Sequence, residues 1–396
     1  MQNPHNAEHP HKFRKEQTMK LLQLADLHIG KRVNEFSMLE DQIYILHQIL
    51  DIARERRPDG VLIAGDVYDK TIPSAEAVTV LDGFLTSLAD LHIPVFVVPG
   101  NHDSAERLGF GSHLLRESGV YIAAPYHGAV ERFTLEDAYG PVGIHLLPFL
   151  RPAAVGACHP EEKVDGYDSG VRLALSHADF SGADRHVLVA HQFVTSGGKE
   201  PERSDSEAIT VGGLDNVEVS AFDRFDYVAL GHIHGPQFVG RPSVRYAGSP
   251  LKYSFSEWRQ QKTALLVTLR GPGEEPELEK IPLIPLRNLR VIRGPLAQLT
   301  AMGEKSQDYI EAVLTDEESL ADPLGELRQI YPNLMRLTFD NRRTQTQGGP
   351  GVAQSIREKS PLELFGEFYE AQNGAPLEEE QTALLSQLLA GLEEAR

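Results

Sequence analysis

The sequence predicts an α/β protein with a layered sheet core, followed by a small α/β unit and a helical tail. Five short apolar runs, rich in Val, Ile and Leu, have the length of buried strands. Segments with helical spacing of apolar residues separate the first three runs. A short island of Asp, Asn or His follows each run, and the carboxyl ends of strands are where layered α/β sheets bind ligands.

The five predicted strands are residues 21–24, 61–64, 95–98, 187–190 and 227–230. Their islands, in the same order, are Asp26 with His28, Asp66 with Asp69, Asn101 with His102 and Asp103, His191 alone, and His232 with His234. Strands that alternate with helices and connect by right-handed crossovers form a parallel sheet. We therefore expect the islands to gather at one edge of the core.

Two helices are predicted between the first three strands. Residues 37–54 form the first, with apolar positions at Met38, Ile43, Leu46, Ile49 and Leu50. Ser74 can cap the second, which has apolar positions at Val78, Leu81, Leu85 and Leu88.

Beyond residue 120 the sequence favours shorter strands and more turns. Residues 142–148 predict a strand that ends in a turn, and residues 195–207 predict a mobile polar loop near His191. Gly248 and Pro250 indicate a tight turn close to the last His pair. Residues 263–269 predict a strand that closes the second half of the core.

The ends of the chain differ in character from this core, which we place at residues 19–281. Residues 1–18 have no periodic apolar pattern, which predicts a disordered leader. Residues 282–341 predict a small α/β domain with strands near 287–293, 309–314 and 334–339. Residues 342–358 are typical of a linker, and residues 359–396 predict two amphipathic helices.

Composition limits the classes of protein that the chain can belong to. Its 396 residues are enough for two or three units, and the single cysteine, Cys158, excludes an internal disulfide. No apolar run approaches the roughly 20 residues of a membrane span, so we expect no membrane association and a cytoplasmic location. The net charge of −19 is unfavourable for DNA binding. Basic residues beside the islands permit a local basic rim: Lys31, Arg32, Arg107, Arg151, Arg241, Arg245 and Lys252.

The residue types in the islands predict a metal site. Carboxylate and amide oxygens combined with imidazole nitrogens suit Mn, Fe or Zn better than Ca or Mg, which prefer oxygen alone. Seven candidate ligands are too many for one ion. With Asp66 as a bridge they would fill two sites about 3.5–4 Å apart, the arrangement that holds a hydroxide and clamps phosphate oxygens.

In this order, the motifs D-x-H, G-D-x-x-D, G-N-H-D, H and G-H-x-H resemble those of the calcineurin-like metallophosphoesterases. The resemblance implies a core of two sheets flanked by helices. It implies a first metal held by Asp26, His28, Asp66 and His234. It implies a second metal held by Asp66, Asn101, His191 and His232.

The resemblance also suggests catalytic roles. His102 is similar to the family's catalytic histidine, which contacts the phosphate and protonates the leaving oxygen. Asp69 is predicted to orient His102, although some relatives carry His at that position. Asp103 has either a role in the site or only a structural role in capping the turn.

Longer segments resemble the double-strand-break repair nucleases of this superfamily. They are Asp-Leu-His-Ile-Gly, Gly-Asp-Val-Tyr-Asp-Lys, Pro-Phe-Leu-Arg-Pro, Ala-Leu-Gly-His-Ile-His and Tyr-Ala-Gly-Ser-Pro, within a resemblance that covers residues 19–396. One departure is His191-Gln192-Phe193, where many relatives carry Gly-His-x. The resemblance implies a nuclease with two divalent ions, Mn being favoured, that acts as exonuclease on double-stranded ends and endonuclease on single strands and hairpins.

The same resemblance implies partners. They are DNA and an SbcC-like coiled-coil ATPase, in DNA repair and recombination. Residues 359–396 would dock on that ATPase or, alternatively, fold back on the chain's own core. A homodimer is left open.

Two other functions are compatible with the motifs. One is a stand-alone phosphodiesterase or phosphatase for a small molecule or a phosphoprotein. The other is a non-catalytic scaffold, against which the complete ligand set argues. We favour the nuclease because a small-molecule enzyme has no evident need for the tethered helical tail.

Overall fold

The computed structural model describes residues 18–207, 215–301, 305–318 and 320–341, and nine residues between 362 and 385. The chain divides into two compact units. The first is Met1–Val291 with Gln307–Glu311, and the second is Ile292–Ser306 with Ala312–Arg396. The predicted leader, apart from its last residue, and the predicted linker lie outside the described residues.

Two six-stranded sheets form the first unit. The first sheet has the order β16-β15-β1-β4-β5-β6. Its strands are β1 (Lys20–Leu24), β4 (Gly60–Ala64), β5 (Val95–Val98), β6 (Val120–Ile122), β15 (Thr263–Thr268) and β16 (Glu277–Pro282). The parallel arrangement expected for β1, β4 and β5 is confirmed, and β6 continues it.

One prediction about the sheets is wrong. Residues 263–269 were expected to close the second half of the core, but β15 pairs with β1 of the first sheet, in antiparallel orientation. The strand is buried along most of its length, so its apolar pattern suits a central position in either sheet.

The second sheet has the order β13-β14-β12-β9-β8-β7. Its strands are β7 (Glu131–Asp137), β8 (Gly140–Leu147), β9 (Arg185–His191), β12 (Tyr227–Gly231), β13 (Gln237–Val239) and β14 (Arg241–Tyr246). The four strands β8, β9, β12 and β14 run parallel. Two small ribbons accompany the sheets: β2 (Arg32–Val33) with β3 (Phe36–Ser37), and β10 (Phe193–Thr195) with β11 (Asn216–Glu218).

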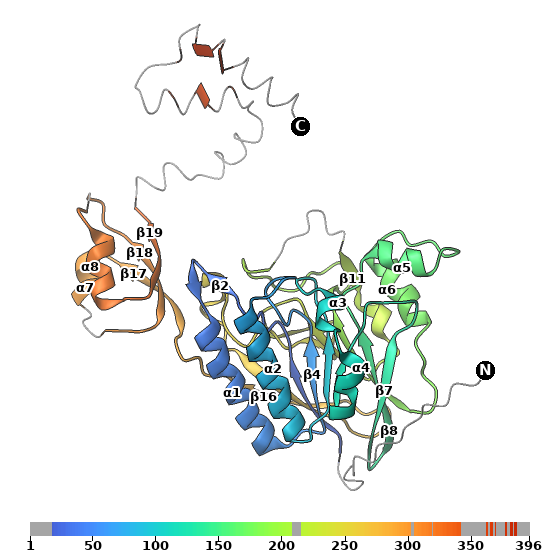
Figure 1. Cartoon of the computed structure of the whole chain (residues 1–396). Coiled ribbons are helices and arrows are strands. Elements are labelled where there is room, and N and C mark those ends of the chain that lie inside the picture. Colours follow the sequence, from blue (N-terminus) through green and yellow to red (C-terminus); the bar gives the residue numbers. More distant parts are fainter. Residues whose placement is uncertain are drawn as a thin grey trace. The chain divides into compact units, whose positions relative to one another are not determined.

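An apolar core fills the space between the two sheets, with Leu62 and Phe96 from the first and Val187 and Ala229 from the second. Helices α1 (Leu39–Arg56) and α2 (Ala75–Asp90) lie side by side at the first sheet (Figure 1). Helices α5 (Pro152–Cys158) and α6 (Tyr167–Ser176) pack on the outer face of the second. The short elements are α3 (Ala105–Leu108), α4 (Ser112–Leu115), η1 (Arg116–Ser118), η2 (Val219–Phe222) and η3 (Phe255–Glu257).

The helix predictions are confirmed in position but not in every buried residue. Ser74 caps α2 as expected, and its Oγ accepts a hydrogen bond from the Ala77 nitrogen at 3.3 Å. Val78, however, is 45% exposed, and Ile43 of α1 is 36% exposed. The buried face of α2 consists of Ala77, Leu81, Phe84 and Leu88, which lie on one side at 3.6 residues per turn.

A three-stranded sheet, β17 (Leu289–Gly294), β18 (Tyr309–Leu314) and β19 (Leu334–Phe339), follows with α7 (Leu296–Ala301) and α8 (Pro323–Ile330). The three strands predicted in this region are all present. In the tail, the described residues at 362, 365, 366, 369, 381, 382, 384 and 385 are helical. Gln381 Nε2 donates to the Tyr369 hydroxyl at 3.2 Å. Among the described residues, no helix has the length and apolar character needed to span a bilayer.

Candidate metal centre

The polar islands meet at the carboxyl ends of strands from both sheets. The parallel pairs β1–β4 and β9–β12 bring the loops after each strand to the same edge, and Gly231 pairs with His191. The backbone there adopts positive φ at four non-glycine residues: Asp26 (52°), His28 (45°), Asp66 (46°) and His232 (106°). Such conformations cost of order 1–3 kcal/mol each and concentrate at functional sites. The fold therefore holds these loops under local strain.

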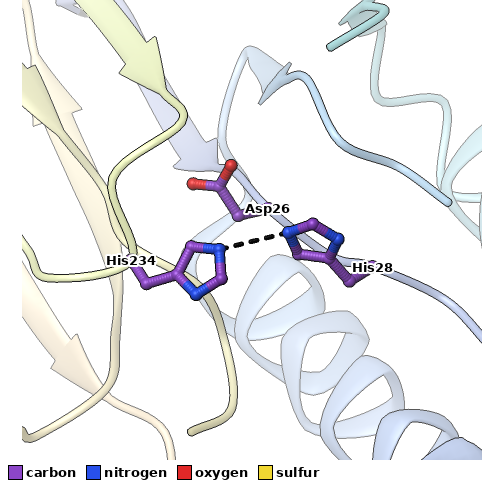
Figure 2. A group of neighbouring side chains, drawn as sticks. All are labelled: Asp26, His28 and His234. Atoms are coloured by element: carbon purple, nitrogen blue, oxygen red, sulfur yellow. Dashed lines mark hydrogen bonds between the residues drawn. The ribbon is translucent and has the colours of Figure 1, made fainter. Parts of the chain in front are cut away.

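Asp26, His28 and His234 form the first cluster (Figure 2). His28 Nε2 and His234 Nε2 lie 3.1 Å apart, and one ligand atom from each residue lies within 4.8 Å of the other two. All three side chains are almost fully buried. Three of the four residues predicted for the first metal thus converge on one point.

Asn101, His191 and His232 form the second cluster. Asn101 Oδ1 lies 2.9 Å from His191 Nε2 and 3.1 Å from His232 Nδ1. These are the residues predicted for the second metal, apart from the shared Asp66. The structure also places Asp26 near this group, 3.8 Å from His191 Nδ1, which the sequence did not predict.

Asp66 lies between the two clusters. Its Oδ2 is 3.6 Å from His28 Nε2 and 3.4 Å from His191 Nε2, so one carboxylate oxygen faces a histidine from each cluster. Its Oδ1 accepts the backbone N–H of His102 at 2.9 Å. Asp66 is therefore placed within reach of both clusters.

His102 is partly buried, with 28% of its side chain accessible. Its Nδ1 donates to the main-chain carbonyl oxygen of Asp69 at 3.0 Å, and its Nε2 lies 4.0 Å from Asp66 Oδ2. The Asp69 carboxylate instead accepts a hydrogen bond from Lys31 at 2.6 Å and lies 3.5 Å from His28 Nδ1. Asp69 therefore contacts His102 through its backbone rather than its side chain.

Asp103 has the structural role that the sequence left open. Its carboxylate accepts three backbone N–H groups, from Val67 at 3.0 Å, Tyr68 at 2.9 Å and Gly100 at 2.9 Å. These bonds join the second and third islands. We conclude that Asp103 shapes the site but does not face it.

Hydrogen bonds fix which nitrogen of several histidines is available. A carbonyl oxygen can only accept, so the Nδ1 atoms of His102 and His191, which face carbonyls, carry the protons. The Ser206 hydroxyl donates to Glu257 Oε1 at 2.6 Å, so His234 Nδ1 donates to Ser206 Oγ at 2.8 Å. In His191 and His234 this leaves Nε2 as the ring atom that faces the site, which is the arrangement of metal-ligating histidines, whereas in His102 it leaves Nε2 for proton exchange.

The electrostatics of the cluster also suit cations. Burial lowers the pKa of His28 to about 4 and that of His232 to about 3, so both are neutral near pH 7, as ligands must be. Burial raises the pKa of Asp26 to about 7. Burial alone would lower the pKa of His191, but Asp66 and Asp26 outweigh it and raise that pKa to about 9. Positive charge is thus favoured between the carboxylates.

The residues present fit divalent metal ions. Asp26 Oδ2 is buried without a hydrogen-bond partner in the described structure, although it lies in the cluster. Two glycines leave the space that two of the proposed ligand residues, Asp66 and His191, occupy. A Cβ at Gly100 would lie 2.1 Å from Asp66 Oδ1, and a Cβ at Gly65 would lie 2.1 Å from His191 Nδ1.

Three residues that support the site were missed by the sequence. Ser206 and Glu257 hold the His234 ring, and Lys262 Nζ donates to Glu257 at 2.5 Å and to the His234 carbonyl at 2.9 Å. Glu257 and Lys262 are buried, at 0% and 5% exposed. A buried charged residue indicates a structural or functional role, but a single sequence does not show which residues are buried.

A second support comes from α1. Gln42 Nε2 donates to the His28 carbonyl at 2.7 Å and to the Tyr253 hydroxyl at 3.0 Å, and its Oε1 accepts from Gly30 at 2.9 Å. The Tyr253 hydroxyl donates to the Leu27 carbonyl at 2.6 Å. Together they hold the first island in its strained conformation.

Comparisons with known proteins agree with this geometry. The family model for calcineurin-like phosphoesterases matches residues 19–236, and a model described as the type 5 capsule protein repressor C-terminal domain matches residues 285–373. A curated relative, the D subunit of the nuclease SbcCD from Staphylococcus epidermidis, is 31% identical over 382 residues, which is 94% of this chain and 98% of that protein. The chain belongs to the SbcD family of calcineurin-like phosphoesterases.

Two solved structures show a more distant likeness to this SbcD-family chain. They are TT1561 of Thermus thermophilus (12% identity, 68% of this chain and 100% of that chain, TM-score 0.38) and a dimetal phosphatase from Danio rerio (12%, 67% and 97%, TM-score 0.40). These TM-scores are too low to support an argument. Family membership and the clustered ligands make the protein a phosphoester hydrolase with a divalent-metal centre.

Proposed function

We propose that this protein is a metal-dependent DNA nuclease that cuts phosphodiester bonds as exonuclease on double-stranded ends and endonuclease on single strands and hairpins. The observation that carries the proposal is the convergence of Asp26, His28 and His234 on one side of Asp66, and of Asn101 and His191 on the other. The similarity to a nuclease subunit over 94% of the chain supports DNA as the substrate.

We assign roles to the residues of the site on this basis. Asp26, His28, Asp66 and His234 would hold the first ion, and Asp66, Asn101, His191 and His232 the second. Two divalent ions, with Mn favoured by the mixed oxygen and nitrogen ligands, would supply the nucleophile and neutralise the phosphate. His102 would protonate the leaving oxygen through Nε2, since its Nδ1 is held by the Asp69 carbonyl.

The proposal extends to partners and organisation. By similarity to the curated relative, the protein would act with an SbcC-like coiled-coil ATPase in DNA repair and recombination, and residues 359–396 would dock on that partner. We retain the nuclease domain at 19–281, the capping domain at 282–341 and a possible homodimer as proposals. A cytoplasmic location follows from the proposed substrate.

One preparation of the full chain tests the function. Linear duplex, hairpin, single-stranded DNA and bis-p-nitrophenyl phosphate are incubated with Mn, Mg or EDTA, beside an Asp66→Asn control. We expect all three DNA substrates to be cut with Mn and none in EDTA or by the control. Hydrolysis of the small diester with no DNA cleavage would instead favour a stand-alone phosphodiesterase.

A further inference from the structure

Three Lys or Arg side chains are buried among the described residues: Arg185, Arg245 and Lys262, at 2%, 8% and 5% exposed. Arg185 is paired with Asp137, and Lys262 is paired with Glu257. Arg245 has no carboxylate within ion-pair distance in the described part of the chain. A buried charge without a counter-charge is costly, so two of these three cations follow the general rule and one departs from it.

The hydrogen bonds of Arg245 are also incomplete. A guanidinium has five N–H donors. Arg245 makes one long bond, from Nη1 to the Pro242 carbonyl at 3.4 Å, and its Nε is buried without a partner. An anion at this position would supply both the missing charge and the missing acceptors.

Arg245 lies at the open edge of the sandwich. On β14 it pairs with Ala229 of β12, a member of the core between the sheets, and with Phe238 of the edge strand β13. The edge strand of the other sheet is β16. The two edges border a groove lined by Pro236, Gln237, Phe238, Arg245, Leu278 and Lys280.

The lining of this edge groove has the chemistry that recognises a nucleotide. It contains two cations, Arg245 and Lys280, and no acidic side chain among the described residues. Phe238 is 55% exposed, and the Arg245 guanidinium lies 6.0 Å from the centre of its ring. An exposed aromatic ring beside a basic groove is the usual platform for single-stranded nucleic acid, with bases stacked on the ring and phosphates on the cations.

The residues that line the edge groove are close along the chain to those of the candidate metal centre. Pro236 and Gln237 follow His234 directly after Gly235, and Gln237 pairs with Tyr246, whose hydroxyl donates to the Gln192 carbonyl next to His191. The first groove residue is therefore only two positions from a proposed metal ligand.

We propose that the edge groove binds a single DNA strand beside the metal centre, with a phosphate on Arg245 and Lys280 and a base on Phe238. The identification of the ligand as a DNA strand rests on the proposed nuclease function. The net charge of −19 makes such a local acid-free groove more important, because the protein as a whole repels DNA.

Binding of a labelled oligothymidylate to the full chain in EDTA, followed by fluorescence anisotropy, tests the proposal without cleavage. We expect Arg245→Gln and Lys280→Gln each to weaken binding about tenfold and to reduce the slope of log affinity against log salt by about 0.7. Phe238→Ala should weaken binding roughly 5- to 150-fold, with little change in that slope. Arg245→Lys should restore part of the affinity. The matched control Lys163→Gln, at a side chain 84% exposed in the loop between α5 and α6, should bind like the wild type.

Melting temperatures accompany each variant. If Arg245→Gln fails to fold, Lys280→Gln and Phe238→Ala still decide the question, because both side chains are exposed. Equal affinity of the wild type and these two variants would overturn the proposal. It would also be overturned if inorganic phosphate alone stabilised the wild type as much as the oligonucleotide does, since the groove would then be a small-anion site.

Cleavage assays with Mn separate this proposal from the function on which it rests. Groove variants should lose cleavage of long single strands but keep hydrolysis of bis-p-nitrophenyl phosphate, which is too small to reach the groove. Unchanged cleavage of long strands would contradict DNA binding in the groove but would leave the proposed nuclease function standing. If the wild type binds the oligonucleotide but cuts no DNA, the proposed nuclease function is contradicted and the proposal that the groove binds a DNA strand still stands.

Discussion

The two ends of strand β9 carry buried polar residues that are treated in opposite ways. At its beginning, Arg185 is paired with Asp137 and donates to the carbonyls of Gly140 at 2.8 Å and Arg270 at 3.1 Å. At its end, His191 faces Asp26 and Asp66, and neither carboxylate has a Lys or Arg within ion-pair distance in the described structure. At the first end of β9, the cation is the Arg185 side chain, and Asp137 neutralises it. At the second end, carboxylates and imidazoles surround a point where a metal cation would fit.

The backbone shows the same difference. The loops at the His191 end contain the four proposed ligand residues with positive φ, whereas Asp137 and Arg185 have negative φ. A charge-balanced cluster stabilises the fold at ordinary backbone geometry. A cluster that requires strain and leaves Asp26 Oδ2 without a partner is instead prepared for a ligand.

The largest effect is expected for His102→Ala, which leaves the seven proposed ligands unchanged. Turnover on DNA should fall roughly 10²–10⁴-fold, the usual contribution of general acid–base catalysis, while bound metal stays the same. Turnover is measured beside metal content by elemental analysis. Activity within a few-fold of the wild type would remove His102 from the mechanism, and loss of metal would make it a ligand.

Asp137→Asn tests the other end of β9. It leaves a buried guanidinium without its partner, so the free energy of unfolding should fall by about 3–5 kcal/mol, measured by chemical denaturation. Metal content should not change. A loss of metal without a loss of stability would contradict the division between the two ends.

The same pair makes a pH prediction. Burial opposes ionisation of Asp137, but the hydrogen bond from Arg185 outweighs burial, so the pKa of the Asp137 carboxyl is lower in the folded protein than in the unfolded chain. The stabilisation is therefore complete above the unfolded pKa of about 3.9 and is lost as pH falls through the lower folded value. Asp137→Asn should lack this acid-dependent component. An identical pH profile for the two proteins would exclude the pair as its source.

Ser206→Ala should have a smaller effect. The hydroxyl holds His234 Nδ1 in place, and loss of such a partner weakens metal binding by about 10–100-fold. Titration with Mn measures the affinity. Ser176→Ala is the matched control, because its hydroxyl only bonds the Leu173 carbonyl within α6. Equal affinity of both variants would show that Ser206 does not position the ligand.

Gly83→Ala gives the smallest expected effect, and Gly100→Ala provides a contrast to it. Gly83 lies in α2, and, apart from its chain neighbours and the backbone of its own helix, no described atom lies within 4 Å of the position that a Cβ would take there. Gly83→Ala should therefore stabilise the protein by about 0.5–1 kcal/mol. Gly100→Ala would place its Cβ 2.1 Å from Asp66 Oδ1 and should lose metal. Thermal melts and metal content of the two variants check this, and retained metal in Gly100→Ala would contradict the tight packing of the site.

Much of the site could be predicted from the sequence because its elements are local. The parallel pair β1–β4 brings Asp26 and Asp66 to one edge, and the parallel pair β9–β12 brings His191 and His232 to one edge. The meeting of these two edges depends on how the two sheets pack, which the sequence does not show. The sheet that receives β15 could not be predicted, because pairing with β1 joins residues from opposite ends of the core. The helix faces were partly wrong, since Val78 and Ile43 satisfy helical spacing yet lie on the solvent side.

The supporting residues were missed for a related reason. Ser206, Glu257 and Lys262 come from separate segments and resemble ordinary loop residues until the fold brings them to His234. Arg245 was one of seven basic residues beside the islands. Its burial and its lack of an acid partner became visible only in the structure.

The central claim is that the clustered acids and histidines at the end of β9 hold two divalent ions through a shared Asp66. Elemental analysis of the full chain after equilibration with Mn and gel filtration tests it most directly, with Asp66→Asn and Asp137→Asn beside the wild type. We predict about two ions per chain for the wild type and Asp137→Asn, and at most one for Asp66→Asn. Two retained ions in Asp66→Asn, or none in the wild type, would contradict the account.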